Sequence, residues 1–100
     1  MDFKDYKNTK VIVRSVNAGV FYGEITDIDG DTVELKNARC LWYWSGAASL
    51  NQLATEGVKY PNDCKFTLEV EQLVIMGVCE ILKVTDLAQK SIGGVAPWVI

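Results

Sequence analysis

The sequence of 100 residues contains no histidine, only two prolines and only two arginines. Without histidine, a Ser/His/Asp or Cys/His catalytic arrangement and an imidazole metal site are both excluded. A formal net charge of −3 also leaves the chain short of the cations that neutralise the phosphates of duplex DNA or RNA. We therefore expect no enzyme, no metal, no cofactor and no duplex nucleic acid as a partner.

Signals for export and for membranes are lacking as well. The segment Met1–Asp5 resembles neither a signal peptide nor a transit peptide, and no apolar run approaches the roughly 20 residues that span a bilayer. Cys40, Cys64 and Cys79 are an odd number without CxxC spacing, which favours reduced thiols used as small apolar side chains. The sequence predicts one soluble domain over residues 1–100 in a reducing cytoplasm, with no membrane partner.

What the sequence does contain is short runs of β-branched and aromatic residues, separated by turn residues. These runs predict strands over Lys10–Arg14, Val20–Thr26, Thr32–Lys36, Arg39–Trp44, Leu68–Met76 and Val78–Val84. Gly23 predicts a bulge or a sharp bend inside the second strand, and Asp29-Gly30 predicts a hairpin turn after it. Ser49 and Thr85 each fit the start of a short helix, the first ending at Gly57 and the second at Gly93-Gly94.

Together these elements predict an α+β fold, a small and strongly bent antiparallel sheet or barrel with two short helices. Residues 23–38 resemble the bent hairpin of Sm-like and SH3-like barrels, and Gly77–Val84 resembles their second hairpin. Pro97 restricts the segment Val95–Ile100 to an edge strand or an extended tail. Because this tail is apolar, we expect it to pack against the domain.

The densest group of binding residues lies between Lys36 and Ser49, with two cations, an amide, three consecutive aromatics and a predicted helix start. Aromatic rings stack on nucleobases, arginine binds phosphate through two parallel hydrogen bonds, and the N–H groups at a helix start attract anions. These residue types predict a nucleotide site with nine candidate ligand contacts: Arg39, Trp42, Tyr43, Trp44, Arg14, Lys36, Asn37, Ser45 and Ser49.

A purely structural interpretation of the same residues stands beside this one. Strand alternation would place Leu41 and Tyr43 on one face and Trp42 and Trp44 on the other. One face would then fill the core and the other an oligomer interface, and the two arginines would be surface partners of nearby carboxylates. A small chain with such a doubly apolar strand also predicts a homo-oligomer, either a dimer or a tetramer.

The chain also resembles a family of small proteins of tailed bacteriophages. The similarity covers nearly the whole chain and includes Val11–Ser15, Ala18–Phe21, Leu35–Arg39, Leu41–Trp44, Gly46–Leu50 and Gln52–Ala54. Its most specific part is the series Asn-Ala-Arg, Leu-Trp-Tyr-Trp and Gly-Ala-Ala-Ser-Leu. The resemblance implies an anti-defence role in the host bacterial cytoplasm. The protein would capture, without cleaving it, a cyclic dinucleotide or related signal of the CBASS or Thoeris type.

Two other functions fit the same residues. A protein-interaction module or inhibitor that docks on a host or phage protein suits an acidic surface and exposed tryptophans, which are common interface anchors. A single-strand nucleic-acid binder on an Sm-like scaffold is disfavoured by the net charge. The residues alone do not choose the nucleotide, and they leave open whether Trp42–Trp44 forms a pocket, core or interface.

Overall fold

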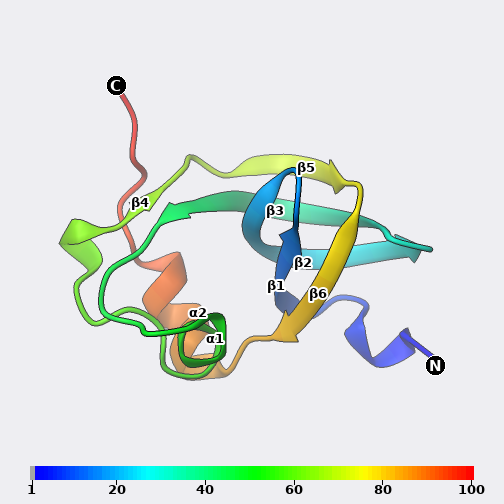
Figure 1. The fold of residues 1–100 in the computed structure, drawn as a ribbon, viewed down its shortest axis with the longest axis horizontal. Helices are drawn as coiled ribbons and strands as arrows, with labels where there is room; N and C mark the ends of the chain where they lie inside the picture. Colours follow the sequence, from blue (N-terminus) through cyan, green and yellow to red (C-terminus); the bar gives the residue numbers. More distant parts are fainter. Residues whose placement is uncertain (1) are drawn as a thin grey trace.

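The computed structural model describes residues 2–100 and contains an antiparallel sheet with two α-helices against one side (Figure 1). The strands are β1 (Lys10–Ser15), β2 (Gly19–Asp29), β3 (Thr32–Tyr43), β4 (Lys65–Phe66), β5 (Val70–Ile75) and β6 (Val78–Lys83). The helices are α1 (Leu50–Glu56) and α2 (Asp86–Gly93), and single 3-10 turns cover Lys4–Tyr6 and Pro61–Asp63. The predicted α+β class is confirmed.

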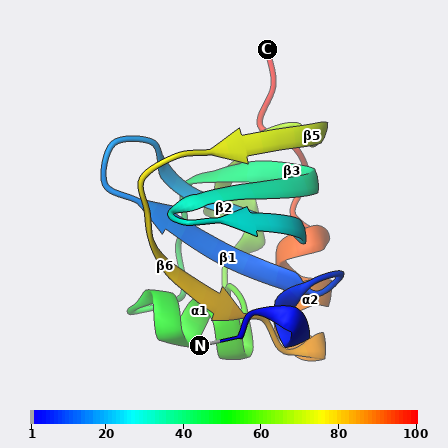
Figure 2. The same ribbon diagram turned by 90° about the vertical axis from the view of Figure 1, so that its right-hand side faces the viewer.

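The order of the strands forces the sheet to curl. β1, β2 and β3 form a meander, β6 pairs with the other side of β1, and β4 and β5 pair with successive parts of β3. β5 and β6 thus lie on opposite edges, yet only Met76 and Gly77 join them. Four strand spacings of a flat sheet amount to about 19 Å, whereas this link spans at most about 11 Å. The sheet must therefore bend until the end of β5 and the start of β6 come together, which Figure 2 shows.

Two details of this topology differ from the expectations. The likeness of Gly77–Val84 to a second hairpin is wrong, because β6 pairs with β1, and β5, the strand before it, pairs with β3. Gly77, at φ 70°, turns the chain from one edge of the sheet to the other. The predicted strands Thr32–Lys36 and Arg39–Trp44 are one continuous strand, β3.

The irregularity inside β3 is absorbed by Asn37, which has a φ of 50°, a conformation that asparagine tolerates better than most residues. On the neighbouring strand, Tyr22 faces Arg39 and Glu24 faces Lys36, so an irregularity does occur at Gly23, but the extra residue of the bulge lies on β3 and not on β2. A Cβ on Gly23 would lie 2.9 Å from the Cβ of Ala38. Glycine is needed there because the two strands approach too closely for a side chain.

Each face of the sheet carries its own apolar cluster. On the helix side, Ile12, Leu41 and Phe66 pack with Leu53 of α1 and Ile92 of α2. The inside of the curled sheet is filled by another set: Val11, Val13, Ile25, Val33, Leu35, Ala38 and Ile75. Successive side chains of β1 point alternately into the two clusters, because both faces of this strand are covered. The helices and the curled sheet are thus held together through one shared central strand.

The last residues pack less than expected. Val95 is buried, and the backbone N–H of Trp98 donates to the carbonyl of Phe66 at 2.8 Å, so the chain is attached to β4 as far as Trp98. Val99 and Ile100 are exposed, and the expectation that the whole tail packs down is wrong for them. Among residues 2–100, no helix has the length and apolar character needed to cross a bilayer.

Candidate functional site

Arg39, the expected phosphate contact, lies in the interior with 4% of its surface exposed. Its guanidinium donates four hydrogen bonds to backbone carbonyls. Nε bonds Thr67 at 3.0 Å, Nη2 bonds Phe66 at 3.2 Å, and Nη1 bonds Ile92 and Val95 at 3.2 and 2.9 Å. Burial lowers the pKa of Arg39, against smaller opposing effects of Glu69 and Tyr22.

These bonds give Arg39 a structural role in place of the predicted contact with a ligand phosphate. The side chain joins β3 to the β4 end and to the carbonyls at the end of α2, where the helix dipole favours a cation. The expected surface position with a carboxylate partner is also wrong, because the ion pairs among residues 2–100 do not include Arg39. Three residues further along the chain, Trp42 is exposed at the surface.

A bulge decides which aromatic side chains are exposed. Leu41 pairs with Phe66 and Tyr43 pairs with Lys65, so two steps along β3 correspond to one step along β4. Trp42 is the extra residue, and strict alternation is lost at this point. As a result Trp42 and Tyr43 are both exposed while Leu41 is buried, which overturns the predicted faces.

Trp42 does not stand alone on the surface. Its ring stacks on that of Trp98, with centroids 5.2 Å apart and an interplanar angle of 28°. The Nζ of Lys65 lies 5.4 Å from both ring centroids. A cation at this distance from a ring is attracted by its electron-rich face. We call this group, with the adjacent Tyr43, the tryptophan–lysine surface.

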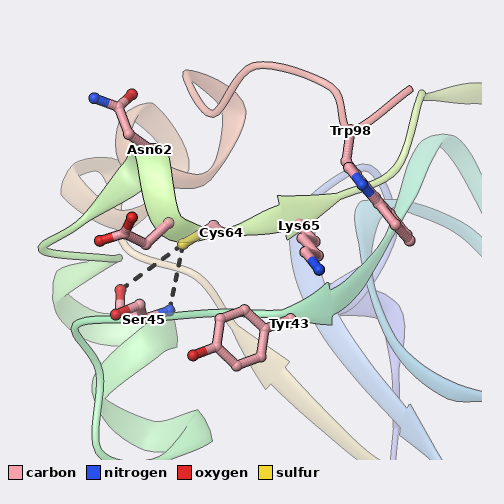
Figure 3. Close-up of a pocket in the computed structure, with 7 residues that line it drawn as sticks. Tyr43, Ser45, Asn62, Cys64, Lys65 and Trp98 are labelled. Atoms are coloured by element: carbon pink, nitrogen blue, oxygen red, sulfur yellow. Dashed lines mark hydrogen bonds between the residues drawn. The ribbon is translucent and has the colours of Figure 1, made fainter. Parts of the chain in front are cut away.

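A shallow hollow of about 550 Å³ adjoins this surface. Its walls are formed by Lys65 and Trp98 on one side and by Tyr43 and Ser45 on the other (Figure 3). Asn62, Asp63 and Cys64 complete the lining. The Cys64 thiol is tied to the Ser45 backbone, accepting from its N–H at 3.4 Å, and this contact fixes the floor of the hollow. The hollow offers aromatic faces, a cation, a hydroxyl and an amide.

Three of the other predicted contacts lie elsewhere and have other partners. Arg14 is on β1, two strands away from β3, and its Nε donates to Glu80 at 2.9 Å. Lys36 pairs with Glu24 at 3.2 Å, and six residues of strand place it about 20 Å from Trp42. Asn37 is exposed beside it, at the irregularity of β3. The structure does not bring these residues together with the tryptophans.

Trp44 and Ser49 are used by the fold itself. Trp44 is partly buried and packs on the helix-side core. The Ser49 Oγ accepts from the N–H of Gln52 at 3.1 Å, and the Gln52 side chain accepts from the N–H of Ala48 at 2.7 Å. The predicted helix start at Ser49 is confirmed, with the Gln52 side chain reaching back to Ala48, one residue before the cap. Because the Ser49 hydroxyl already accepts from the first turn of the helix, the predicted anion contact at Ser49 is not retained.

The sequence interpretation missed Lys65 and Trp98. Lys65 begins a two-residue strand that carries no periodic signal, and Trp98 reaches the site from the far end of the chain. In the sequence, the signal for this part of the site is the apolar tail that contains Trp98, and that tail predicts packing against the domain and not a binding surface. Tyr43 and Ser45 are the predicted residues that line the hollow, with Trp42 beside it.

Comparison with known proteins gives a family. Residues 8–92 match the model of the family described as a domain of unknown function, DUF6948. The match includes β1 to β6 and both α-helices except the last residue of α2. A search of curated proteins found no match.

Proposed function

The chain belongs to the DUF6948 family, and we propose that it is a non-catalytic binding domain that captures a small nucleotide signal on the tryptophan–lysine surface. The observation that carries the proposal is the pair of stacked, solvent-exposed tryptophans beneath one lysine. Trp42 and Trp98 expose 61% and 46% of their surface. Large apolar rings gathered in the open, beside a hollow, are typical of binding surfaces.

The chemistry of this surface suits a planar, anionic ligand. Each tryptophan has an outer face on which a nucleobase can stack, a contact worth roughly 1–3 kcal/mol per base. Lys65, whose Nζ lies 5.4 Å from both ring centroids, would bind a phosphate, while Ser45 and Asn62, which line the hollow, would supply hydrogen-bonding groups. One lysine matches the few charges of a cyclic dinucleotide or related signal better than a long phosphate backbone.

The mechanism would be sequestration without cleavage. The sequence has no histidine to act as a base, and bound ligand would be held and returned unchanged. The resemblance to tailed-phage proteins supports a role of this kind against CBASS or Thoeris defences, in the host bacterial cytoplasm. Removal of the free signal needs only tight, stoichiometric binding, because the defence effector responds to its free concentration.

Tryptophan fluorescence titrated with a panel of cyclic nucleotides tests the proposal. We expect quenching by at least one member, with Trp98→Ala weakening that binding about five- to a hundredfold through the lost stacking contact. Lys65→Gln should weaken it about tenfold and make it less sensitive to salt. Lys36→Gln, which removes a lysine far from the tryptophans, is the matched control and should bind like the wild type.

The recovered ligand distinguishes capture from turnover. After heat denaturation of the complex, chromatography should return the nucleotide intact. Hydrolysed product would refute sequestration, and no response to any nucleotide at micromolar concentration would refute the ligand class.

A protein-interaction module is the second candidate, and the charge of the hollow favours it. Asp63 lines the hollow together with Lys65, so the site is not uniformly positive, and Tyr60 nearby in the chain is exposed as well. Exposed tryptophan and tyrosine are the residues that dominate protein interfaces. This function predicts a silent nucleotide panel and capture of a defined host or phage protein that Trp98→Ala abolishes.

A further inference from the structure

A stripe of apolar side chains runs along the outward face of β5 and its flanking residues. Leu68, Val70, Val74 and Met76 expose 60%, 47%, 51% and 70% of their surface. They are spaced two residues apart with Gln72 at the centre, so they point to the same side of the strand. The stripe contains no charged residue.

Two of the adjacent positions on the neighbouring strand are charged, whereas Val70 lies beside Ala38. In the register between the strands, Val74 lies beside Glu34 and Gln72 lies beside Lys36. Polar side chains are therefore accommodated on this part of the sheet, and the apolar stripe is confined to β5. An uncharged, apolar edge strand is a ready template for another strand unless something covers it.

The outer edge of β5 is available for pairing. β5 is hydrogen-bonded to β3 on one side, and within residues 2–100 no strand pairs with its other side. In Figure 2, β5 is the uppermost strand, with β3 below it and no strand above it. Its backbone N–H and C=O groups on that side can therefore bond a further strand.

The sequence of the stripe is symmetric about Gln72. Antiparallel pairing of two copies centred on this residue would place Val70 opposite Val74, Leu68 opposite Met76, and Gln72 opposite itself. On the other face, Glu71 would lie opposite Leu73 and no two carboxylates would face each other. A register centred on Glu71 would instead set two carboxylates together, which is destabilising.

From this symmetry we propose that a second copy of the chain occupies the β5 edge, forming a two-fold dimer whose two sheets are continuous. Two-fold interfaces use the same patch on both subunits, which is what the mirrored order of Leu68, Val70, Gln72, Val74 and Met76 provides. The interface differs from the one expected at Leu41–Trp44, where Leu41 and Trp44 serve the core. An interface one strand wide implies association in the micromolar range.

Sedimentation velocity on the full chain tests the dimer. The wild type should sediment at twice the chain mass of 11.1 kDa at a concentration of about 100 µM, in line with micromolar association. Val70→Lys and Val74→Glu should each yield monomers, since a charge would face an apolar side chain. Leu87→Lys, at an equally exposed position on α2, should remain dimeric. A thermal melt on each variant shows that it is folded.

The double variant Val70→Lys/Val74→Glu tests the register. Within one chain these positions are about 13 Å apart along the strand, so the new charges cannot pair internally. Across the proposed dimer each lysine would face a glutamate of the second copy, and the dimer should return. A double variant that stays monomeric refutes the register centred on Gln72.

Other outcomes overturn the proposal itself. A wild type that is monomeric at this concentration refutes a second copy as the occupant, even if the edge then binds an unrelated extended peptide. Single variants that stay dimeric place the interface elsewhere. None of these positions lines the hollow beside the tryptophan–lysine surface, so nucleotide titration of the same variants keeps this result separate from the proposed function.

Discussion

Replacing Arg39 with methionine removes the buried guanidinium and keeps a side chain of similar length. Two of its four carbonyl partners have a second donor, since Phe66 also accepts from Trp98 and Ile92 also accepts from Val95. The carbonyls of Thr67 and Val95 would lose the donor that Arg39 supplies. An unsatisfied buried polar group costs roughly 1–3 kcal/mol. We therefore expect Arg39→Met to lower the free energy of unfolding by about 3–5 kcal/mol.

Such a loss is a large share of the 5–15 kcal/mol typical of a domain. At roughly 4–8 °C for each kcal/mol, the melting temperature should fall by roughly 12–40 °C. Thermal melts by circular dichroism and urea titration measure both quantities. Arg39→Lys keeps the charge with fewer donors and should fall between the wild type and Arg39→Met.

The other arginine is the control. Arg14 is exposed and its Nε bonds Glu80 at the surface, so Arg14→Met should melt close to the wild type. If Arg39→Met melts like Arg14→Met, the internal hydrogen bonds contribute little. In that case the reasoning fails and a ligand role for Arg39 becomes the better account.

Three further predictions follow from buried or crowded groups. Burial, aided by Glu69, raises the pKa of Tyr22 to about 12, so the folded state keeps this proton longer than the unfolded chain. The contribution of Tyr22 to the free energy of unfolding should be fully present below pH 10 and should fall by about 2–3 kcal/mol as the pH rises to 12. In urea titrations, Tyr22→Phe should reduce this loss of stability. Because Cys79 is exposed, Cys64 is buried, and burial raises the pKa of Cys40, a thiol reagent should label one cysteine rapidly in the native protein. Cys79→Ser should remove that phase, and two rapidly labelled thiols would contradict this order of exposure. Gly57→Ala should lose about 2 kcal/mol or more in thermal melts, because φ is 79° and a Cβ would overlap Ser91; Gly93→Ala, with open space around it, should not.

The sequence predicts the local parts of the fold better than their arrangement. Capping at Ser49 and Thr85, the irregularity of the β2–β3 pair at Gly23 and the start of β1 follow from residue types within a few positions. The pairing of β5 with β3 depends instead on how the whole sheet curls. The short link at Gly77 has the composition of a hairpin turn, and only the tertiary pairing shows that it joins two edges.

The site was hard to predict for a similar reason. An arginine beside three aromatics has the composition of a phosphate site whether its side chain points outward or inward. The Arg39 side chain points inward because its guanidinium bonds four backbone carbonyls, and these come from segments far away in the sequence: Phe66, Thr67, Ile92 and Val95. Trp42 became exposed because of a bulge against β4, a strand of two residues that sequence periodicity cannot reveal.

Arg39 and the tryptophan–lysine surface are nevertheless connected. Arg39 bonds the carbonyls of Val95 and Phe66, and Phe66 in turn accepts the N–H of Trp98. The segment that carries Trp98 onto Trp42 is therefore held at two points that depend on this guanidinium. An Arg39 variant should therefore lose nucleotide binding together with stability, because Trp98 would be displaced from Trp42. Loss of binding alone cannot identify Arg39 as a ligand contact, whereas Trp98→Ala, which leaves the Arg39 hydrogen bonds in place, tests the surface directly.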